Sequence, residues 1–237
     1  MSAEGVSMTF SNKNAVVMME LNSQTDFVTT NSEFLSYAYK IGQALLSGKF
    51  SSSEEANNVK DSSGKTIKEI TIEATAKIGE KIILRRAVKF NIEEGKSFGH
   101  YTHSNKRVAA ILVLEGGTDE LARNFAMHVA SMNPQYLNSD AIPTVDIDKM
   151  KKEISESEVI MSKPEKIREK IAEGMLSKKL SELTLVDQEF VMEKGKVSQH
   201  IKNAGAKEIS MSRFEVAEGI EVEVVDFAAE VAAQMGK

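Results

Sequence analysis

Short apolar stretches of strand length alternate with polar turns in both halves of the chain. A Ser-Asn-Lys-Asn turn at 11–14 separates two β-rich stretches, which is typical of a β-hairpin. A similar hairpin is predicted around Ser104 and Asn105, and one further strand follows in each half. The predicted strands span residues 6–10, 15–21 and 81–92 in the first half and 99–103, 108–115 and 209–216 in the second.

After the second strand of each half, apolar residues recur every three or four positions, which predicts an amphipathic helix. These positions are Phe34, Tyr37, Ala38, Ile41 and Leu45 in the first half and Phe125, Val129 and Met132 in the second. Together the patterns favour an α+β fold with two related subdomains. In each subdomain a small antiparallel sheet is backed by helices.

The two halves are related in sequence. Residues 9–26 and 102–119 are identical at seven of eighteen positions without a gap, at an offset of 93. Residues 89–95 resemble 213–219 at a larger offset. A match fixed in register over this length indicates an internal duplication. The two copies differ where the first has Phe27 and the second has Glu120.

Insertions distinguish the halves further. Residues 47–65 are polar and predict a mobile loop or a weak helix. In a charged segment, Pro164 begins a predicted helix, whose apolar stripe is Ile167, Ile171, Leu176, Leu180 and Leu183. We therefore expect a first half at 1–97, a second half at 98–145 and 186–224, a helical hairpin insertion at 146–185 and an Ala-rich C-terminal helix at 225–237.

Composition narrows the classes of function. The chain has 237 residues, and its charge is 30 − 35 = −5 with few aromatic residues, which argues against direct binding of nucleic acid. It has no cysteine, which excludes disulfides, thiolate metal sites and cysteine nucleophiles. No apolar run is long enough for a membrane span, and no signal peptide is recognised. We therefore expect a cytoplasmic protein without a membrane partner.

The sequence contains no Walker P-loop and no G-x-G-x-x-G. His100 and His103 are three apart in a predicted strand and so point to opposite faces, which is poor for joint metal binding. We expect no metal site and no catalytic residue. A metal-dependent hydrolase that uses these two histidines and Asp119 stays open as an alternative. A polar loop carries an aromatic residue, Phe27, which either packs beneath its own helix or inserts into a partner.

Several segments together form a specific signature. They are N-S-Q-T-D-F-V at 22–28, I-G-E at 78–80, R-R at 85–86, A-M-H-V-A at 126–130, N-P-Q-Y-L at 133–137, K-P-E-K-I at 163–167, E-G at 173–174, Q-E-F-V at 188–191, R-F-E-V-A-E-G-I at 213–220 and D-F-A-A-E-V-A-A at 226–233. Through them nearly the whole chain resembles the elongation factor Ts family, and the two-part core of that family agrees with the internal duplication.

This resemblance implies a guanine-nucleotide exchange factor for the GTPase elongation factor Tu, with no bond chemistry and no cofactor of its own. By the same resemblance, Thr25, Asp26, Phe27 and Val28 form a wedge. The wedge enters the partner near its Mg²⁺ and phosphate site, and GDP leaves. His128 is expected to face the GTPase domain.

At the N-terminus the sequence departs from the family. Residues 2–6 resemble the segment that follows the small helical module with which members usually begin. Because that module helps to grip the partner in the family, a second reading is an elongation-factor-Tu-binding scaffold or chaperone without full exchange activity. GDP-release kinetics with the partner would separate the two readings.

Overall fold

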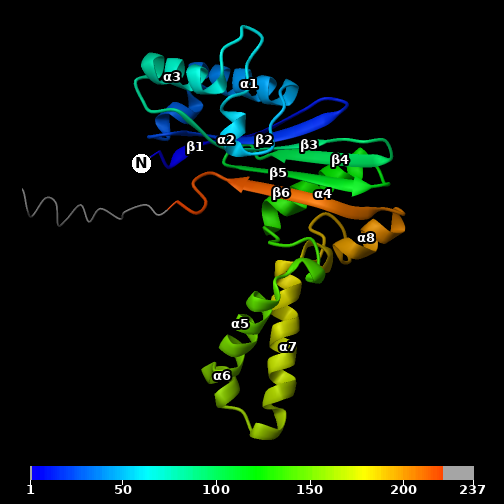
Figure 1. The fold of residues 1–237 in the computed structure, drawn as a ribbon. Helices are drawn as coiled ribbons and strands as arrows, with labels where there is room; N and C mark the ends of the chain where they lie inside the picture. The colour runs from blue at the N-terminus through cyan, green and yellow to red at the C-terminus, as the bar shows by residue number, and fades with distance from the viewer. Residues whose placement is uncertain (1, 221–237) are drawn as a thin grey trace, which may run out of the picture.

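The computed structural model describes residues 2–220, in which two three-stranded antiparallel sheets stack face to face (Figure 1). The α+β class and the two helix-backed sheets are as the sequence predicts. The strands of the first sheet, in spatial order, are β1 (Glu4–Ser11), β2 (Ala15–Ser23) and β3 (Ile83–Asn91). Those of the second are β4 (Lys96–Thr102), β5 (Val108–Glu115) and β6 (Lys207–Glu215). The C-terminal helix expected at 225–237 lies outside the described residues.

The central strands are buried on both faces. Every residue of β2 is buried, and so is most of β5. A thin apolar layer joins the two sheets and includes Val16 and Met18 from the first and Ile111 and Phe214 from the second. Because both faces of these strands are covered, their sequences are almost continuously apolar and do not alternate with polar residues.

Helices cover the two outer faces, so the body has four layers. The outer face of the first sheet packs against α1 (Ser32–Ser47) and α3 (Ile67–Ile78), and that of the second against α4 (Asp119–Met132) and α8 (Val197–Asn203). The shorter helical turns are η1 (Phe27–Thr30), α2 (Ser53–Ala56), η2 (Ser139–Ala141) and η3 (Leu185–Asp187). Part of the predicted mobile segment is fixed, because Ala56 and Val59 are buried in the first core.

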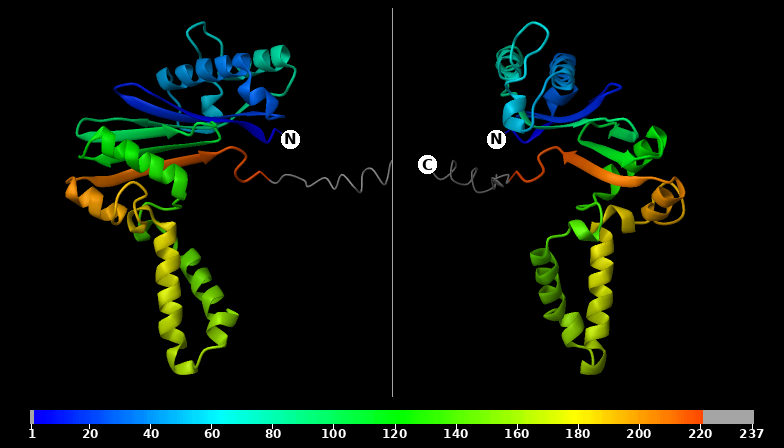
Figure 2. Two further views of the ribbon diagram at one scale, coloured as in Figure 1. Left: turned by 180° about the vertical axis from the view of Figure 1, so that it is seen from behind. Right: turned by 45° about the vertical axis from the view of Figure 1, so that its right-hand side comes forward.

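A helical arm projects from the second half (Figures 1 and 2). It consists of α5 (Thr144–Ser155), α6 (Glu158–Met161) and α7 (Glu165–Leu183), and α7 begins directly after Pro164 as predicted. Of the predicted apolar stripe on α7, Ile171, Leu176, Leu180 and Leu183 are half-buried, Ile167 is exposed, and no residue of the helix is fully buried. Five residues separate Ile171 from Leu176, which turns the two side chains about 140° apart around the helix.

The duplication is visible in the strand register. A bulge interrupts the first sheet between Glu20 and Leu21 and the second between Val113 and Leu114, at the predicted offset of 93. The first strands depart from this offset, because Met18 pairs with Thr9 whereas Ile111 pairs with His100. The structural counterpart of Thr9 is therefore His100, two residues before the Thr102 that the gapless alignment selects.

Candidate functional site

The connection from the central strand to the following helix differs in length between the two halves. In the first half it is the exposed loop (residues 24–31), and α1 begins 32 − 21 = 11 residues after Leu21. In the second half α4 begins 119 − 114 = 5 residues after the equivalent Leu114. The connection in the first half is therefore six residues longer, and all four residues of the predicted wedge lie in it.

Neighbouring residues of the exposed loop point in opposite directions. The side chain of Phe27 is 85% exposed, whereas that of Val28 is 8% exposed and belongs to the first core. Asp26 is exposed and Thr25 is half-buried. The interpretation that Phe27 packs beneath its own helix is therefore wrong. Val28 anchors the loop to the core, and Phe27 faces solvent.

Local hydrogen bonds fix the backbone around Phe27. The Thr29 amide and hydroxyl both donate to the Asp26 carbonyl, at 3.0 and 2.7 Å, and the Asn31 amide donates to the Val28 carbonyl at 3.0 Å. The side chain of Asn31 then caps α1 by accepting from the Glu33 amide at 2.8 Å. These contacts form one short 3₁₀ turn followed by a capped helix.

A second anchor comes from the connection between α3 and β3. The Glu80 carboxylate accepts hydrogen bonds from the Thr25 hydroxyl at 2.5 Å and from the Thr25 and Gln24 amides at 3.0 and 3.2 Å. The Thr25 hydroxyl, the largest influence, together with the two amides, holds the pKa of the Glu80 carboxyl below its usual value. In the sequence Glu80 appears only as the last residue of the I-G-E motif.

The second half has no aromatic residue at the corresponding place. Thr118 caps α4 directly, since its hydroxyl accepts from the Leu121 amide at 3.2 Å. Asp119 accepts from the Phe98 amide at 3.0 Å, and Glu120 lies exposed in the first turn of the helix. This junction is thus an ordinary strand-to-helix connection.

His128 lies in the second core and is fully buried. Its Nδ1 accepts from the Val191 amide at 3.3 Å, so Nε2 carries the proton and donates to Gln188 Oε1 at 2.9 Å. Burial lowers the pKa of this imidazole, which favours the neutral form that these contacts require. The predicted exposure of His128 toward a partner is not found. The ring instead holds the backbone amide of Val191, and the side chains of Val191 and Met192 are exposed.

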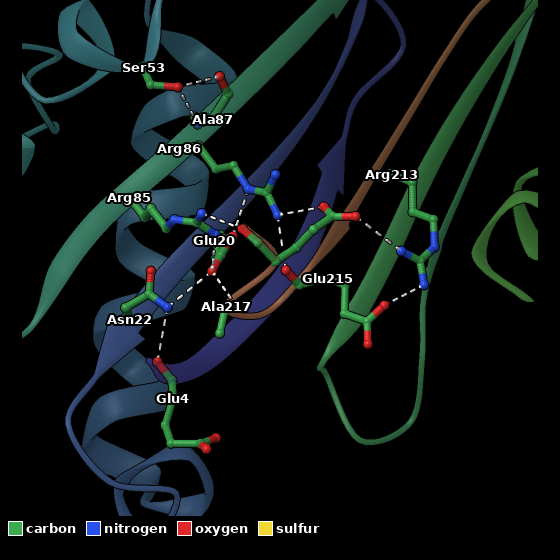
Figure 3. A network of polar contacts seen from close by, with 11 residues as sticks. Glu4, Glu20, Asn22, Ser53, Arg85, Arg86, Ala87, Arg213, Glu215 and Ala217 are labelled. Atoms are coloured by element: carbon green, nitrogen blue, oxygen red, sulfur yellow. Dashed lines mark hydrogen bonds and ion pairs between the residues drawn. The ribbon is translucent and has the colours of Figure 1, made fainter. Parts of the chain in front are cut away.

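A buried polar network joins the two halves (Figure 3). The Glu20 carboxylate in β2 is fully buried and accepts from Arg85 Nη1 at 3.0 Å, Arg86 Nε at 2.6 Å and the Ala217 amide at 2.9 Å. Arg86 also donates to the Glu215 carbonyl at 2.9 Å and lies 4.2 Å from the centre of the Phe214 ring. The network ties β2 and β3 to the turn that follows β6.

The residues of the hydrolase alternative do not converge. His100 contacts the hydroxyls of Thr9 and Ser11, each at 2.9 Å, and His103 contacts the Tyr101 hydroxyl, whereas Asp119 accepts from a backbone amide. Between residues 2 and 220, no cluster of three or more histidine, aspartate or glutamate side chains could hold a metal ion. In the same range no helix is long and apolar enough to cross a membrane.

Comparison with known proteins adds to this geometry. Residues 24–218 match the sequence profile of the family described as Elongation factor TS. The chain is 46% identical over 237 residues to elongation factor Ts of Mycoplasmopsis pulmonis (strain UAB CTIP), a match that covers 100% of this chain and 81% of that protein. It is 41% identical over 241 residues to elongation factor Ts of Acholeplasma laidlawii (strain PG-8A), again covering 100% of this chain and 81% of the relative. The chain belongs to the elongation factor Ts family.

Proposed function

We propose that this chain promotes GDP release from elongation factor Tu by inserting its exposed loop beside the Mg²⁺ and phosphate site of that GTPase. Members of the elongation factor Ts family bind elongation factor Tu and exchange its nucleotide, and they are neither enzymes nor cofactor-dependent. In this proposal Phe27 and Asp26 enter the partner, while Thr25 and Val28 hold them in place. Disturbed Mg²⁺ coordination then weakens the hold on GDP.

The observation that carries the proposal is the exposure of Phe27 on a backbone that is fixed at both ends. A large apolar side chain that is 85% exposed is unfavourable in water and gains free energy when a partner covers it. The fixed backbone keeps the cost of ordering the loop low when it binds. Both properties are typical of residues that dominate a binding interface.

The magnitudes show what Phe27 supplies and what it does not. A nucleotide held with nanomolar affinity is bound by about 12 kcal/mol. Accelerating its release by about 10³ to 10⁴ requires about 4 to 5.5 kcal/mol. Burying one phenylalanine supplies about 2 to 3 kcal/mol. The remainder must come from the lost Mg²⁺ coordination and from a wider interface.

Two features of the second half support a wider interface. Val191 and Met192 form an exposed apolar pair, and His128 fixes the backbone beneath them. In the proposal, His128 therefore acts through this surface and does not itself touch the partner. Contact at both halves would anchor the chain on elongation factor Tu while Phe27 acts on the nucleotide site.

The test is the rate of release of fluorescent GDP from elongation factor Tu, with Phe27→Ala compared with the native chain. We expect release to slow by at least about tenfold, from the apolar area that is no longer buried. Glu120→Ala, at the corresponding position of the second half, serves as the control and should change release much less. Unchanged release with Phe27→Ala would refute the wedge. A native chain that binds the partner without accelerating release would support the scaffold reading instead.

A further inference from the structure

We propose that Glu80 is a positioning residue for the exposed loop: its carboxylate holds residues 24–31 in the conformation that presents Phe27. This inference rests on the proposed function for its effect on exchange. The hold on the loop itself can be measured without the partner.

The contacts of Glu80 join two segments that are far apart in the sequence. Oε2 accepts from the Gln24 and Thr25 amides, and Oε1 accepts from the Thr25 hydroxyl, across 55 to 56 residues. The Lys81 amide donates in return to Gln24 Oε1 at 3.1 Å. Four hydrogen bonds thus connect the start of the loop to the turn between α3 and β3.

The turn places Glu80 for this purpose. α3 ends at Ile78 and is capped by Gly79, which has a φ of 85° and is in the left-handed region that glycine adopts without strain. The chain therefore reverses sharply, and Glu80 stands at the edge of the body beside Thr25. An aspartate here would be one methylene shorter, so its carboxylate could not keep all three contacts.

Without Glu80, the strand side of the loop would keep only two hydrogen bonds, one from the Lys81 amide to Gln24 Oε1 and one from the Ser23 hydroxyl to the Thr25 carbonyl. Val28 is in the core, but Phe27 and Asp26 are exposed and contribute no buried contact. A 3₁₀ turn of four residues is too short to be stable alone. Glu80 accepts three further hydrogen bonds on the strand side of Phe27, and so limits the conformations from which the loop must be ordered on binding.

A carboxylate suits this position better than an amide. An ionised carboxylate only accepts hydrogen bonds, and all three groups that face it are donors. The lowered pKa of the Glu80 carboxyl agrees with an ionised group. A glutamine could keep the two amides on its single oxygen, and its NH₂ group would then donate to the Thr25 oxygen. Glutamine should therefore restore part of the hold.

The second half supplies a comparison within the same chain. The third strands of the two sheets are related by an offset of 124, since Phe90 pairs with Val16 and Phe214 with Ala109. The position equivalent to Glu80 is therefore 80 + 124 = 204, which is an alanine. That half has neither an extended loop nor an exposed aromatic residue to hold. The carboxylate anchor occurs together with the loop that presents Phe27.

The test compares Glu80→Ala and Glu80→Gln with the native chain, and uses Glu93→Ala as a matched control. Glu93 is also a carboxylate near a strand end, but its side-chain partner is Lys96 on the surface. Hydrogen–deuterium exchange of the Gln24 and Thr25 amides measures the hold directly. We expect exchange to quicken at least about tenfold in Glu80→Ala, by less in Glu80→Gln and not at all in Glu93→Ala.

GDP release from elongation factor Tu gives the second measurement. With Glu80→Ala we expect the rate of GDP release at saturating factor to fall at least about tenfold. The factor concentration that gives half the maximal rate should change less than about threefold, because the other contacts with the partner remain. A general loss of structure would instead lower the melting temperature and alter both parameters, without partial rescue by glutamine.

Unchanged amide exchange in Glu80→Ala overturns the inference. Slowed release with Phe27→Ala but not with Glu80→Ala also overturns it, and leaves the proposed function standing. If Phe27→Ala has no effect on release, the proposed function fails, and amide exchange alone decides whether Glu80 holds the loop.

Discussion

The network around Glu20 gives the most demanding test of how the two halves are joined. We consider Glu20→Gln, which keeps the size of the side chain but removes its charge. The native carboxylate is fully buried and accepts from Arg85, Arg86, Asn22 and the Ala217 amide. A glutamine would turn an NH₂ donor toward guanidinium donors and leave two positive charges without their buried counter-charge.

Breaking a buried ion pair in this way costs about 3 to 5 kcal/mol. The side chains of Arg85 and Arg86 are 23% and 24% exposed, so water partly solvates them after the change, and the lower end applies. We therefore expect the free energy of unfolding to fall by about 3 kcal/mol, which for a protein of this size corresponds to a melting temperature lower by about 6 to 12 °C.

The assay is urea and thermal unfolding followed by circular dichroism. The control is Glu73→Gln, because Glu73 is 43% exposed and its ion pair with Lys65, at 2.6 Å, lies at the surface. Exposed pairs contribute below about 1 kcal/mol. If Glu20→Gln cost no more than this control, the network would not be the joint between the halves, and the argument from burial would be refuted.

Three further predictions concern stability. Burial raises the pKa of the Glu20 carboxyl, but the hydrogen bonds to the carboxylate, that from the Ala217 amide foremost, outweigh burial and leave the pKa below the usual 4.5. The ionised carboxylate should therefore stabilise the fold above pH 4.5, and this stabilisation should be lost as the pH falls. Urea unfolding at falling pH should therefore show a steeper loss for the native chain than for Glu20→Gln, and parallel curves would contradict this. Gly99→Ala would place a Cβ 2.0 Å from the Arg123 amide nitrogen in α4, and should cost about 3 kcal/mol or more in the same unfolding assay. Gly174→Ala meets no atom within 4 Å on α7 and should stabilise the arm by about 1 kcal/mol, seen as a higher melting temperature; a lower one would mean that this glycine has a packing role.

Much of the fold could be predicted because its strands and longer helices are marked by local patterns. The apolar stretches of β2 and β5 and the helical spacing in α1 and α4 each identify one element without reference to the rest. Two helices were not predicted. α8 has seven residues, too few to show a period. α3 does carry a signal, the capping box formed by Thr66 and Glu69.

The site could be predicted only in part, because its supports act across long distances in the sequence. The polar loop around Phe27 is visible as a motif, but the pattern does not decide between an exposed and a buried ring. Glu80 and Glu20 reach partners 55 and 65 residues away, which no local spacing reveals. His128 shows the opposite case, since its motif implies contact with a partner and its helix position buries it.

In the proposed function, the divergence of the two halves lets one fold both grip a partner and act on it. Each half has the same sheet and the same bulge, but only the first has the longer connection that presents Phe27. Insertion of that residue alone supplies less free energy than fast release requires. A second contact adds to this free energy only if the distance between the two contacts is fixed, because a flexible joint would lower the effective concentration of one contact relative to the other. The shared apolar layer and the Glu20 network provide that fixed joint. The stiffness of the loop and the stiffness of the joint are therefore two requirements of the proposed mechanism.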